Sequence, residues 1–341
     1  MDWLFLYLCF ILYRLKEFLQ ILRVLTFLRV WNIILVYKAY LLSIFTKKTF
    51  VWAHPFSISV EPTTECNLHC PECPTGNNSI TRNMGKMDLE LFKSIIDQVY
   101  KRTFYLNLFL QGEPFLHPEL CEFAMYARSK KMYVTISTNG HFFKPDTCEK
   151  IIHSGIQKII VSLDGVSKES YEKYRLGGNF EKVKEGIKLL SEVKKRKHSR
   201  YPYIVIQMLV NSFNEHEIPE MKVLTKEIGA NNLELKSMQI YNNSQFLPRN
   251  EKYNRYTFDF NNNLVLKNNL HNKCFRLWST AVFTSNGDLI ACCYDKNAEH
   301  CFGNINNSNF KNLWKSKHFN DYRSGILKDR KKVQICNNCL E

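Results

Sequence analysis

The sequence lacks an uninterrupted apolar run long enough to cross a membrane, and it lacks a recognisable secretory signal. The first apolar run, Trp3–Tyr13, is well short of the roughly twenty residues that a transmembrane helix needs. The second, Val30–Phe45, is interrupted by Lys38. A signal peptide begins with positive charge, whereas the first basic residue here is Arg14. We therefore expect a cytoplasmic protein whose cysteines stay reduced.

Acidic residues are scarce, and no internal repeat or nucleic-acid-binding signature is present. The 341 residues contain 32 Asp and Glu against 47 Lys and Arg, a formal net charge of +15 at pH 7. This balance favours anionic partners, although a Lys- and Asn-rich composition alone produces it as well. The 45% hydrophobic and 23% charged residues are typical of a globular protein, which excludes a disordered or fibrous chain. We do not expect nucleic acid as a partner.

Strand-like and helix-like segments alternate about six times after residue 55. Strands are expected at 56–60, 105–110, 133–137, 158–163, 203–209 and 233–240. Helices are expected at 88–102, 118–131, 145–154, 180–196 and 215–228, with Asp88 and Pro118 at the starts of the first two. The alternation indicates an α/β fold with a parallel sheet, either an incomplete barrel or an open doubly wound sheet. In both cases ligands bind at the carboxyl ends of the strands.

Twelve cysteines are present, and three of them form a CxxxCxxC motif directly after the first expected strand: Cys66, Cys70 and Cys73. Three thiolates on one loop can hold three irons of a [4Fe–4S] cluster and leave the fourth iron open to a small ligand. Ordinary ferredoxin sites close all four positions. A zinc site, or a cluster with a remote fourth cysteine, is the alternative.

Three further polar motifs follow the next expected strands. They are Gln111-Gly112-Glu113-Pro114, Ser137-Thr138-Asn139-Gly140 and Ser162-Leu163-Asp164-Gly165. Together with the cysteine loop, they resemble the radical S-adenosylmethionine (SAM) superfamily over about residues 56–240. That family carries Gly-Gly-Glu-Pro at the second strand, so Gln111 is a departure. The resemblance implies a partial (βα)6 TIM-type barrel and a [4Fe–4S] cluster that reductively cleaves SAM to a 5′-deoxyadenosyl radical, which abstracts hydrogen from a substrate.

The resemblance also implies which residues bind SAM. These are Gln111, Gly112, Glu113, Pro114, Thr138, Asn139, Ser162 and Asp164. Glu113 is expected to accept a hydrogen bond from the SAM ammonium group, and the backbone at Gly112 to approach the ligand closely. Ser162 and Asp164 are expected to bind the ribose, although Asp164-Gly165 also suits a simple turn. No residue is identified as a general base.

The remaining clustered cysteines lie near the carboxyl end and are candidates for a second metal site: Cys274, Cys292, Cys336 and Cys339. Four thiolates suit tetrahedral zinc or a [4Fe–4S] cluster, and a hairpin at 284–291 is expected to bring the first two together. The pattern resembles the SPASM/Twitch auxiliary-cluster domain, a small Cys-rich α+β unit. Because the sequence continues for only two residues after Cys339, we expect one auxiliary [4Fe–4S] cluster. Cys293 is an alternative ligand to Cys292, Cys301 has no assigned role, and Cys9, Cys121 and Cys148 are expected to be apolar fillers on helices.

We therefore predict four segments. Residues 1–50 form a basic, apolar helical segment, 51–241 the radical SAM core, 242–273 a linker and 274–341 the auxiliary-cluster domain. The first segment suits a helix in the membrane interface, on the inner face of the membrane. Helices that cap the barrel mouth or cover a sheet edge are the alternative, with a transmembrane span as a third.

The sequence predicts a radical SAM enzyme whose substrate is a peptide or a small-molecule, glycan or lipid precursor. Its partners are then SAM, a reductant such as flavodoxin or ferredoxin, and that substrate. Three roles are open for the auxiliary cluster. It accepts an electron from the substrate radical, binds the substrate directly, or is purely structural. The alternative is a non-enzymatic iron–sulfur or zinc protein that acts as a membrane-surface electron carrier or scaffold.

Overall fold

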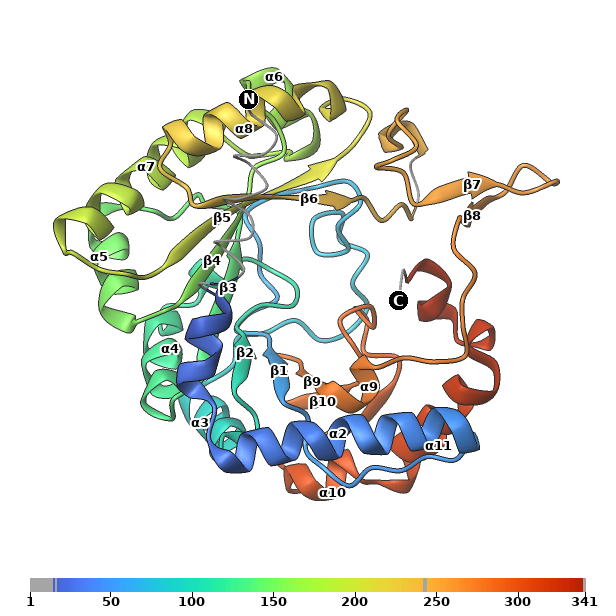
Figure 1. Ribbon diagram of the computed structural model, residues 1–341. Coiled ribbons are helices and arrows are strands. Elements are labelled where there is room, and N and C mark those ends of the chain that lie inside the picture. Colours follow the sequence, from blue (N-terminus) through green and yellow to red (C-terminus); the bar gives the residue numbers. More distant parts are fainter. Residues whose placement is uncertain (1–14, 16, 242–243, 340–341) are drawn as a thin grey trace.

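A curved nine-stranded sheet forms the centre of the computed structural model, which describes residue 15 and residues 17–241 and 244–339 (Figure 1). Six parallel strands follow one another in chain order. They are β1 (Ser57–Val60), β2 (Tyr105–Asn107), β3 (Tyr133–Thr138), β4 (Lys158–Ser162), β5 (Tyr203–Val210) and β6 (Asn232–Ser237). The sheet curls without closing, because β6 forms one edge and β11 (Cys301–Asn304) the other. This partial barrel confirms the expected fold class and excludes the doubly wound alternative.

Helices cover the convex face of the sheet (Figure 1). They are α3 (Leu89–Val99), α4 (Leu120–Ser129), α5 (Pro145–Ser154), α6 (Lys168–Tyr174), α7 (Phe180–Arg196) and α8 (Ile218–Glu227), with short 3-10 turns η1 (Pro114–Leu116) and η2 (Glu215–Glu217). Asp88 caps α3 as expected, since its side chain accepts a hydrogen bond from the Leu91 N–H at 2.8 Å. The prediction for Pro118 was wrong, because α4 begins at Leu120. The helix α6 was not predicted.

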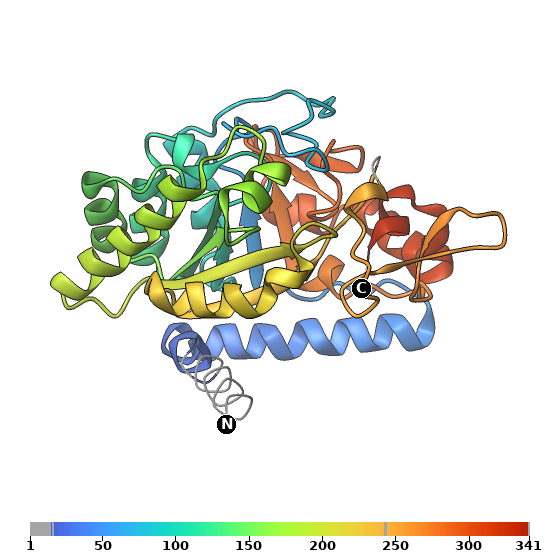
Figure 2. The ribbon, with the colours of Figure 1, turned by 90° about the horizontal axis from the view of Figure 1, so that it is seen from above.

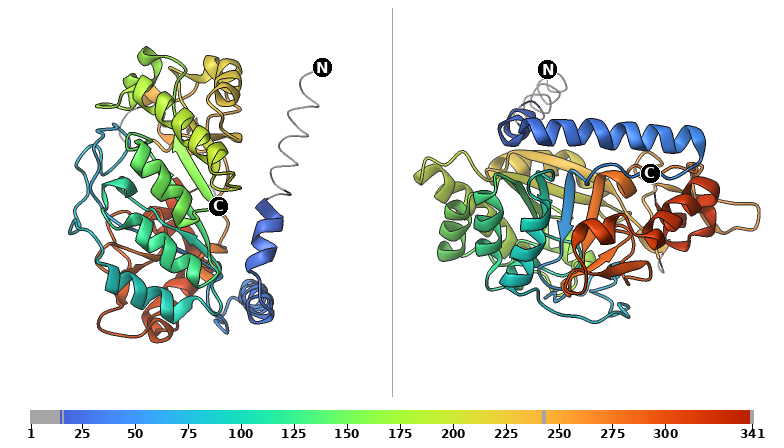
Figure 3. Two further views of the ribbon diagram at one scale, coloured as in Figure 1. Left: turned by 90° about the vertical axis from the view of Figure 1, so that its left-hand side faces the viewer. Right: turned by 90° about the horizontal axis from the view of Figure 1, so that it is seen from below.

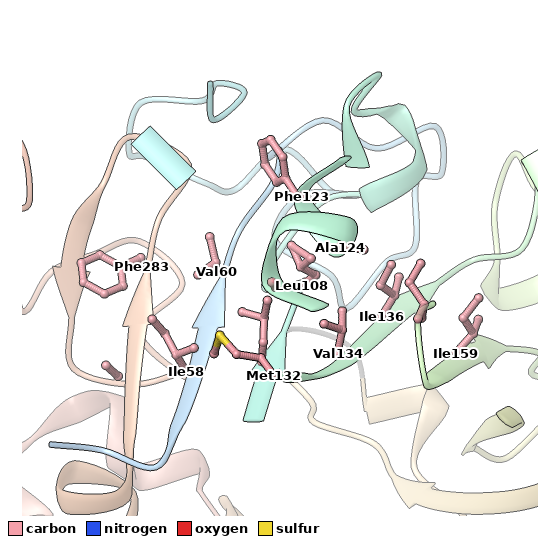
Figure 4. Packing of buried hydrophobic residues seen from close by; sticks show 14 of the residues in the cluster. Ile58, Val60, Leu108, Phe123, Ala124, Met132, Val134, Ile136, Ile159 and Phe283 are labelled. Atoms are coloured by element: carbon pink, nitrogen blue, oxygen red, sulfur yellow. The ribbon is translucent and has the colours of Figure 1, made fainter. Parts of the chain in front are cut away.

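The hydrophobic core lies between the strands and these helices. Strand residues such as Ile58, Val134 and Ile159 are buried in one cluster with residues of the covering helices, among them Phe123 and Ala124 of α4 (Figure 4). The alternate positions on β1 and β2 are polar and line the inside of the curl, where Asn107 donates a hydrogen bond to the Ser59 hydroxyl at 3.3 Å. Period-2 alternation thus places an apolar layer outside the barrel and a polar layer inside it.

The carboxyl-terminal unit continues the same sheet. Strand β9 (Thr280–Phe283) pairs in parallel with β1, and β10 (Asp288–Ile290) and β11 follow in antiparallel order. The hairpin predicted at 284–291 is therefore present but begins earlier, with residues 284–287 in its turn. Around it lie α9 (Arg276–Ser279), α10 (Phe310–Trp314), α11 (Lys317–Asp329), η4 (Arg330–Lys332) and η5 (Gln334–Asn338). The predicted linker contains η3 (Ser244–Phe246) and a small hairpin of β7 (Tyr256–Phe258) and β8 (Leu264–Leu266).

A long amino-terminal helix, α2 (Phe27–Thr46), lies across the amino-terminal ends of the strands (Figure 2). The Arg29 guanidinium fixes it there by hydrogen bonds to the carbonyl oxygens of Tyr100, Lys130 and Lys131, where α3 and α4 end. The helix therefore caps the barrel, but at the end opposite the predicted mouth. By length and composition α2 is also apolar enough to cross a membrane, contrary to our reading of Lys38 as an interruption. The predictions for the Trp3–Tyr13 run and for Cys9 lie outside the described residues.

Candidate functional site

The loop after β1 carries three thiols. Cys70 is buried and Cys66 and Cys73 are half-buried, and the Cys73 N–H donates to the Cys70 carbonyl at 3.1 Å. The loop folds back on itself at Gly76, where an added Cβ would lie 2.6 Å from the Cys70 nitrogen. Burial, with smaller contributions from Glu113 and the neighbouring Cys73 and Cys70, raises the pKa of the Cys66 thiol to about 11. Burial also raises the pKa of the Cys70 thiol. Thiols whose charged form is disfavoured in this way fit a site that a cationic metal cluster completes.

The end of β2 is held against this loop by Gly112. Its φ of +70° suits glycine, and a Cβ there would lie 2.4 Å from the Thr63 carbonyl oxygen. The next residue, Glu113, donates its N–H to the Glu65 carbonyl at 2.7 Å. At the position of the family's first glycine, the Gln111 side chain accepts a hydrogen bond from the Thr75 hydroxyl at 3.2 Å. The departure at Gln111 therefore adds a contact to the cysteine loop.

The Glu113 carboxylate links the ends of β2 and β3. It accepts hydrogen bonds from the Thr138 hydroxyl at 2.6 Å, the Asn139 N–H at 2.7 Å and the Phe115 N–H at 3.1 Å. Only 1% of Glu113 is exposed, and this burial raises the pKa of its carboxyl to about 7, although the three donors act in the opposite direction. Two donors share one carboxylate oxygen, so the other oxygen keeps an acceptor position for a ligand.

Polar residues at the ends of β3 and β4 complete this side of the site. The Asn139 amide donates to the Asn67 side chain at 2.8 Å and lies 4.0 Å from the Cys66 Sγ. Ser162 is half-buried at the end of β4. Asp164 is fully buried, and its carboxylate accepts from the Leu209 N–H at 2.6 Å and from the Arg175 Nε at 2.5 Å. These bonds fix Asp164 in place, and its predicted contact with a ribose stays a prediction.

Arg175 is a site residue that sequence reasoning missed. Its guanidinium bridges the Asp164 carboxylate and Cys70, with an Nη1 to Sγ distance of 3.7 Å. The nearby negative groups, above all Asp164, raise its pKa although burial opposes this. Arg175 therefore places a permanent positive charge beside the cysteine loop. A single arginine carries no spacing signal, so only the structure identifies it.

A second group of thiols lines one small enclosed cavity in the carboxyl-terminal unit. The thiols are the predicted set: Cys274, Cys292, Cys336 and Cys339. Arg330 lies among them, and its Nη2 donates to the Cys339 Sγ at 3.2 Å. Cys293 lines a different cavity and accepts a hydrogen bond from the Arg276 Nη1 at 3.0 Å. The arrangement favours Cys292 over Cys293 as the ligand.

Neither group of thiols has the geometry of a single-ion site. In the part of the chain that the structure describes, no three Cys, His, Asp or Glu side chains form a group that could hold a metal ion. The four carboxyl-terminal thiols line one small cavity. Among the other cysteines, Cys148 is buried in α5 and Cys121 packs against the core from α4, as expected, whereas Cys301 begins β11.

A larger cavity of about 480 Å³ lies beside the second group of thiols. Ser59 and Asn107 line it from inside the barrel, and Arg276 and Cys293 line it from the carboxyl-terminal unit. Cys274 and Cys292 line both this cavity and the enclosed one. The second thiol group is thus adjacent to the space inside the barrel.

A partial parallel barrel with three thiols after its first strand, and a second thiol-lined site behind it, defines an iron–sulfur protein of the radical SAM type. Two family models agree: the radical SAM superfamily model matches residues 60–223, and the SPASM iron-sulfur cluster-binding domain matches residues 274–340. Residues 60–223 are therefore a radical SAM domain and residues 274–340 a SPASM domain. These domains imply a [4Fe–4S] cluster with SAM and auxiliary iron–sulfur binding.

Known proteins share the core but differ in length. The chain is 30% identical to the AdoMet-dependent heme synthase of Methanosarcina barkeri over 177 residues, 52% of this chain and 48% of that protein. It is 30% identical to the subtilosin biosynthesis protein AlbA of Bacillus subtilis over 52% of this chain and 38% of that protein. The matches therefore span about half the length, or less, of these relatives. SuiB of Streptococcus suis has a similar fold, with a TM-score of 0.63 and 14% identity over 80% of this chain and 69% of SuiB.

Proposed function

We propose that this protein is a radical SAM enzyme that oxidises a peptide side chain held in the 480 Å³ cavity. The observation that carries the proposal is that Cys274 and Cys292 line both this cavity and the enclosed thiol site. When bound, a [4Fe–4S] cluster with SAM supplies a hydrogen-abstracting radical, and an auxiliary cluster supplies an electron acceptor. A substrate in the shared cavity lies beside that acceptor.

The residues around the cysteine loop are suited to hold SAM by its amino-acid end. The open acceptor position of Glu113 suits the ammonium group, and Arg175 suits the carboxylate, since a guanidinium binds carboxylates through paired N–H groups. Asp164 then acts through Arg175 by fixing its orientation. The ribose and adenine of SAM then lie near the strand ends that carry Ser162, Thr138 and Asn139. The side of the SAM site next to the cysteine loop is formed by Gln111 and Pro114.

A peptide is the substrate class that we favour. A cavity of about 480 Å³ admits one side chain with its adjoining backbone, and Ser59, Asn107 and Arg276 offer it polar contacts. AlbA is named for the biosynthesis of the bacteriocin subtilosin, and SuiB has been crystallised with its precursor peptide SuiA. A cytoplasmic flavodoxin or ferredoxin is the proposed reductant. An electron carrier or scaffold has no use for the set of groups around Glu113, which argues against a non-enzymatic role.

The first test is formation of 5′-deoxyadenosine from SAM by the anaerobically reconstituted, reduced protein. The matched control is the variant Cys66→Ala/Cys70→Ala/Cys73→Ala, which retains the auxiliary thiols. Product from the wild type alone supports the proposal. If the iron-loaded wild type neither binds SAM nor forms product, the proposal is wrong and the scaffold reading replaces it.

The oxidation is tested separately with Cys336→Ala/Cys339→Ala. This variant is expected to cleave SAM but to leave a peptide substrate without net oxidation. Full oxidation of the peptide by the variant would exclude an electron-accepting role for the second site.

A further inference from the structure

The outer surface of the amino-terminal segment, residues 15–52 with α2 at its centre, is the most apolar exposed part of the described chain. Of the 21 large apolar side chains that are exposed among the described residues, 13 lie between Leu15 and Trp52. On α2 they include Phe27, Trp31, Ile34, Leu41 and Phe45, which are spaced so that they share one face of the helix. Single exposed apolar residues are ordinary, but a contiguous group of this kind marks an interaction surface.

The opposite face of α2 is fixed to the barrel along its length. Besides Arg29 at its start, the Asn32 side chain donates to the His54 carbonyl at 2.8 Å and accepts from the His54 N–H at 3.1 Å. Near its end, the Ser43 hydroxyl accepts from the Phe50 N–H at 2.9 Å, and the Phe50 carbonyl in turn accepts from the Trp278 Nε1 of α9 at 2.8 Å. A helix fixed in this way at both ends cannot cross a bilayer while the barrel stays folded. Its apolar face can only lie against a surface that is parallel to the helix.

The charges around this face are positive. Between residues 15 and 53 the one acidic residue is Glu17, which is buried and paired with Lys158 at 3.3 Å. The exposed cations of this segment include Arg23, Lys38, Lys47 and Lys48. Two more exposed cations, Lys101 and Lys131, lie beside the start of α2. Anionic phospholipid headgroups complement this charge, and Trp31 and Tyr37 are the side-chain types that prefer the boundary between lipid and water.

We infer that the outer face of α2 docks on an anionic phospholipid bilayer, with the helix lying in the plane of the membrane surface. Figures 2 and 3 show α2 along one side of the molecule. The loop that carries Cys66–Cys73 lies on the opposite side in Figure 2. The docked protein therefore turns its SAM-binding end toward the solvent. This inference is independent of the catalytic activity.

The test is sedimentation of the purified full chain with vesicles of phosphatidylcholine, either alone or mixed with phosphatidylglycerol. We expect binding to the mixed vesicles, weakening at high salt, and release by alkaline carbonate. Trp31→Gln/Phe45→Gln is expected to bind about tenfold more weakly. The control is Val223→Gln/Phe258→Gln, which changes two exposed apolar residues on α8 and β7 and is expected to bind as the wild type does.

Three outcomes would overturn the inference. One is equal binding of the wild type to both kinds of vesicle, and another is equal loss of binding in the control variant. The third is a wild-type dimer that does not bind vesicles and that becomes a monomer in the variant Trp31→Gln/Phe45→Gln. That result would assign the apolar face of α2 to contact with a second copy of the chain. Circular dichroism of each variant checks that it is folded.

Discussion

Glu113 joins two strand ends at the point where a ligand is expected, and its protonation decides what it can bind. Burial raises the pKa of its carboxyl to about 7, so the group loses its proton as the pH rises through that value. Only the charged form attracts an ammonium group strongly. We expect the Kd for SAM to be roughly tenfold lower at about pH 8 than at about pH 6, because one pKa unit corresponds to about 1.4 kcal/mol.

Anaerobic calorimetry at the two pH values measures this difference. Glu113→Gln serves as the control and is expected to bind SAM weakly with little dependence on pH. An unchanged wild-type Kd would show that Glu113 does not contact the ammonium group.

Arg175 and Asp164 form a buried ion pair whose halves depend on each other. Arg175→Ala leaves the Asp164 carboxylate buried without its partner, and we expect the free energy of unfolding to fall by about 3 kcal/mol. The double variant Asp164→Asn/Arg175→Ala removes the stranded charge and is expected to lose less than the sum of the single variants. Urea denaturation of the metal-free proteins measures the cycle, and strictly additive losses would contradict the pairing.

Cys292 and Cys293 are adjacent in sequence and both line the larger cavity, but of the two only Cys292 also lines the enclosed one. In the Cys66→Ala/Cys70→Ala/Cys73→Ala background, all remaining iron belongs to the second site. We expect a further Cys292→Ser change to remove that iron and Cys293→Ser to retain it, because only Cys292 lines the enclosed cavity with the other three thiols. Iron analysis and the visible absorption spectrum distinguish the two results. The reverse pattern would assign Cys293 as the ligand.

The site residues that could be predicted from the sequence are those with a regular spacing along the chain. The motifs at the strand ends identified Glu113 and Asn139, since polar residues after successive parallel strands meet at one edge of the sheet. Arg175 has no such spacing. Its importance depends on a carboxylate eleven positions earlier and a thiol 105 positions earlier, which only the fold brings together.

Among the helices, those with strong local signals were the ones predicted correctly. Asp88 caps α3, Pro145 begins α5, and the Asn179 side chain caps α7 by accepting from the Lys182 N–H at 2.9 Å. The short helix α6 was missed although Ser167 forms a capping box with Ser170 at its start, because serine there is a less evident signal than glutamate. The position of α2 depends on contacts with residues far along the chain and was not predictable.

Arg29 tests how α2 is attached. Its guanidinium satisfies carbonyl groups at the ends of α3 and α4, so Arg29→Ala leaves these acceptors without their partner. We expect a loss of about 2–3 kcal/mol in the free energy of unfolding. The exposed Arg23→Ala is the control and should stay within about 0.5 kcal/mol of the wild type. Equal denaturant midpoints for the two variants would show that Arg29 does not hold the helix in place.

In the molecule as a whole, the SPASM domain is part of the central sheet. Removing residues 274–341 would delete β9 and leave β1 as an unpaired edge with apolar neighbours. We expect the shortened chain to aggregate, because exposed strand edges pair with other chains. Size-exclusion chromatography with light scattering measures this.

The control for the shortened chain is full-length Cys336→Ala/Cys339→Ala, which loses cluster ligands but keeps every strand. It is expected to remain monodisperse. A soluble, monodisperse product from the shortened chain would show that the core folds without β9.

The pairing of β1 with β9 also sets an order for synthesis. Ser57 leaves the ribosome early, whereas its neighbour Thr280 emerges only after most of the chain has been made. During that interval the strand that leads to the first three cysteines has an open edge, which makes the nascent chain prone to wrong pairing. The sheet becomes complete only after β11, when Cys274 and Cys292 of the second thiol group have also been made. Iron delivery to both sites is therefore expected to follow release of the chain, with chaperones protecting the unfinished edge until then.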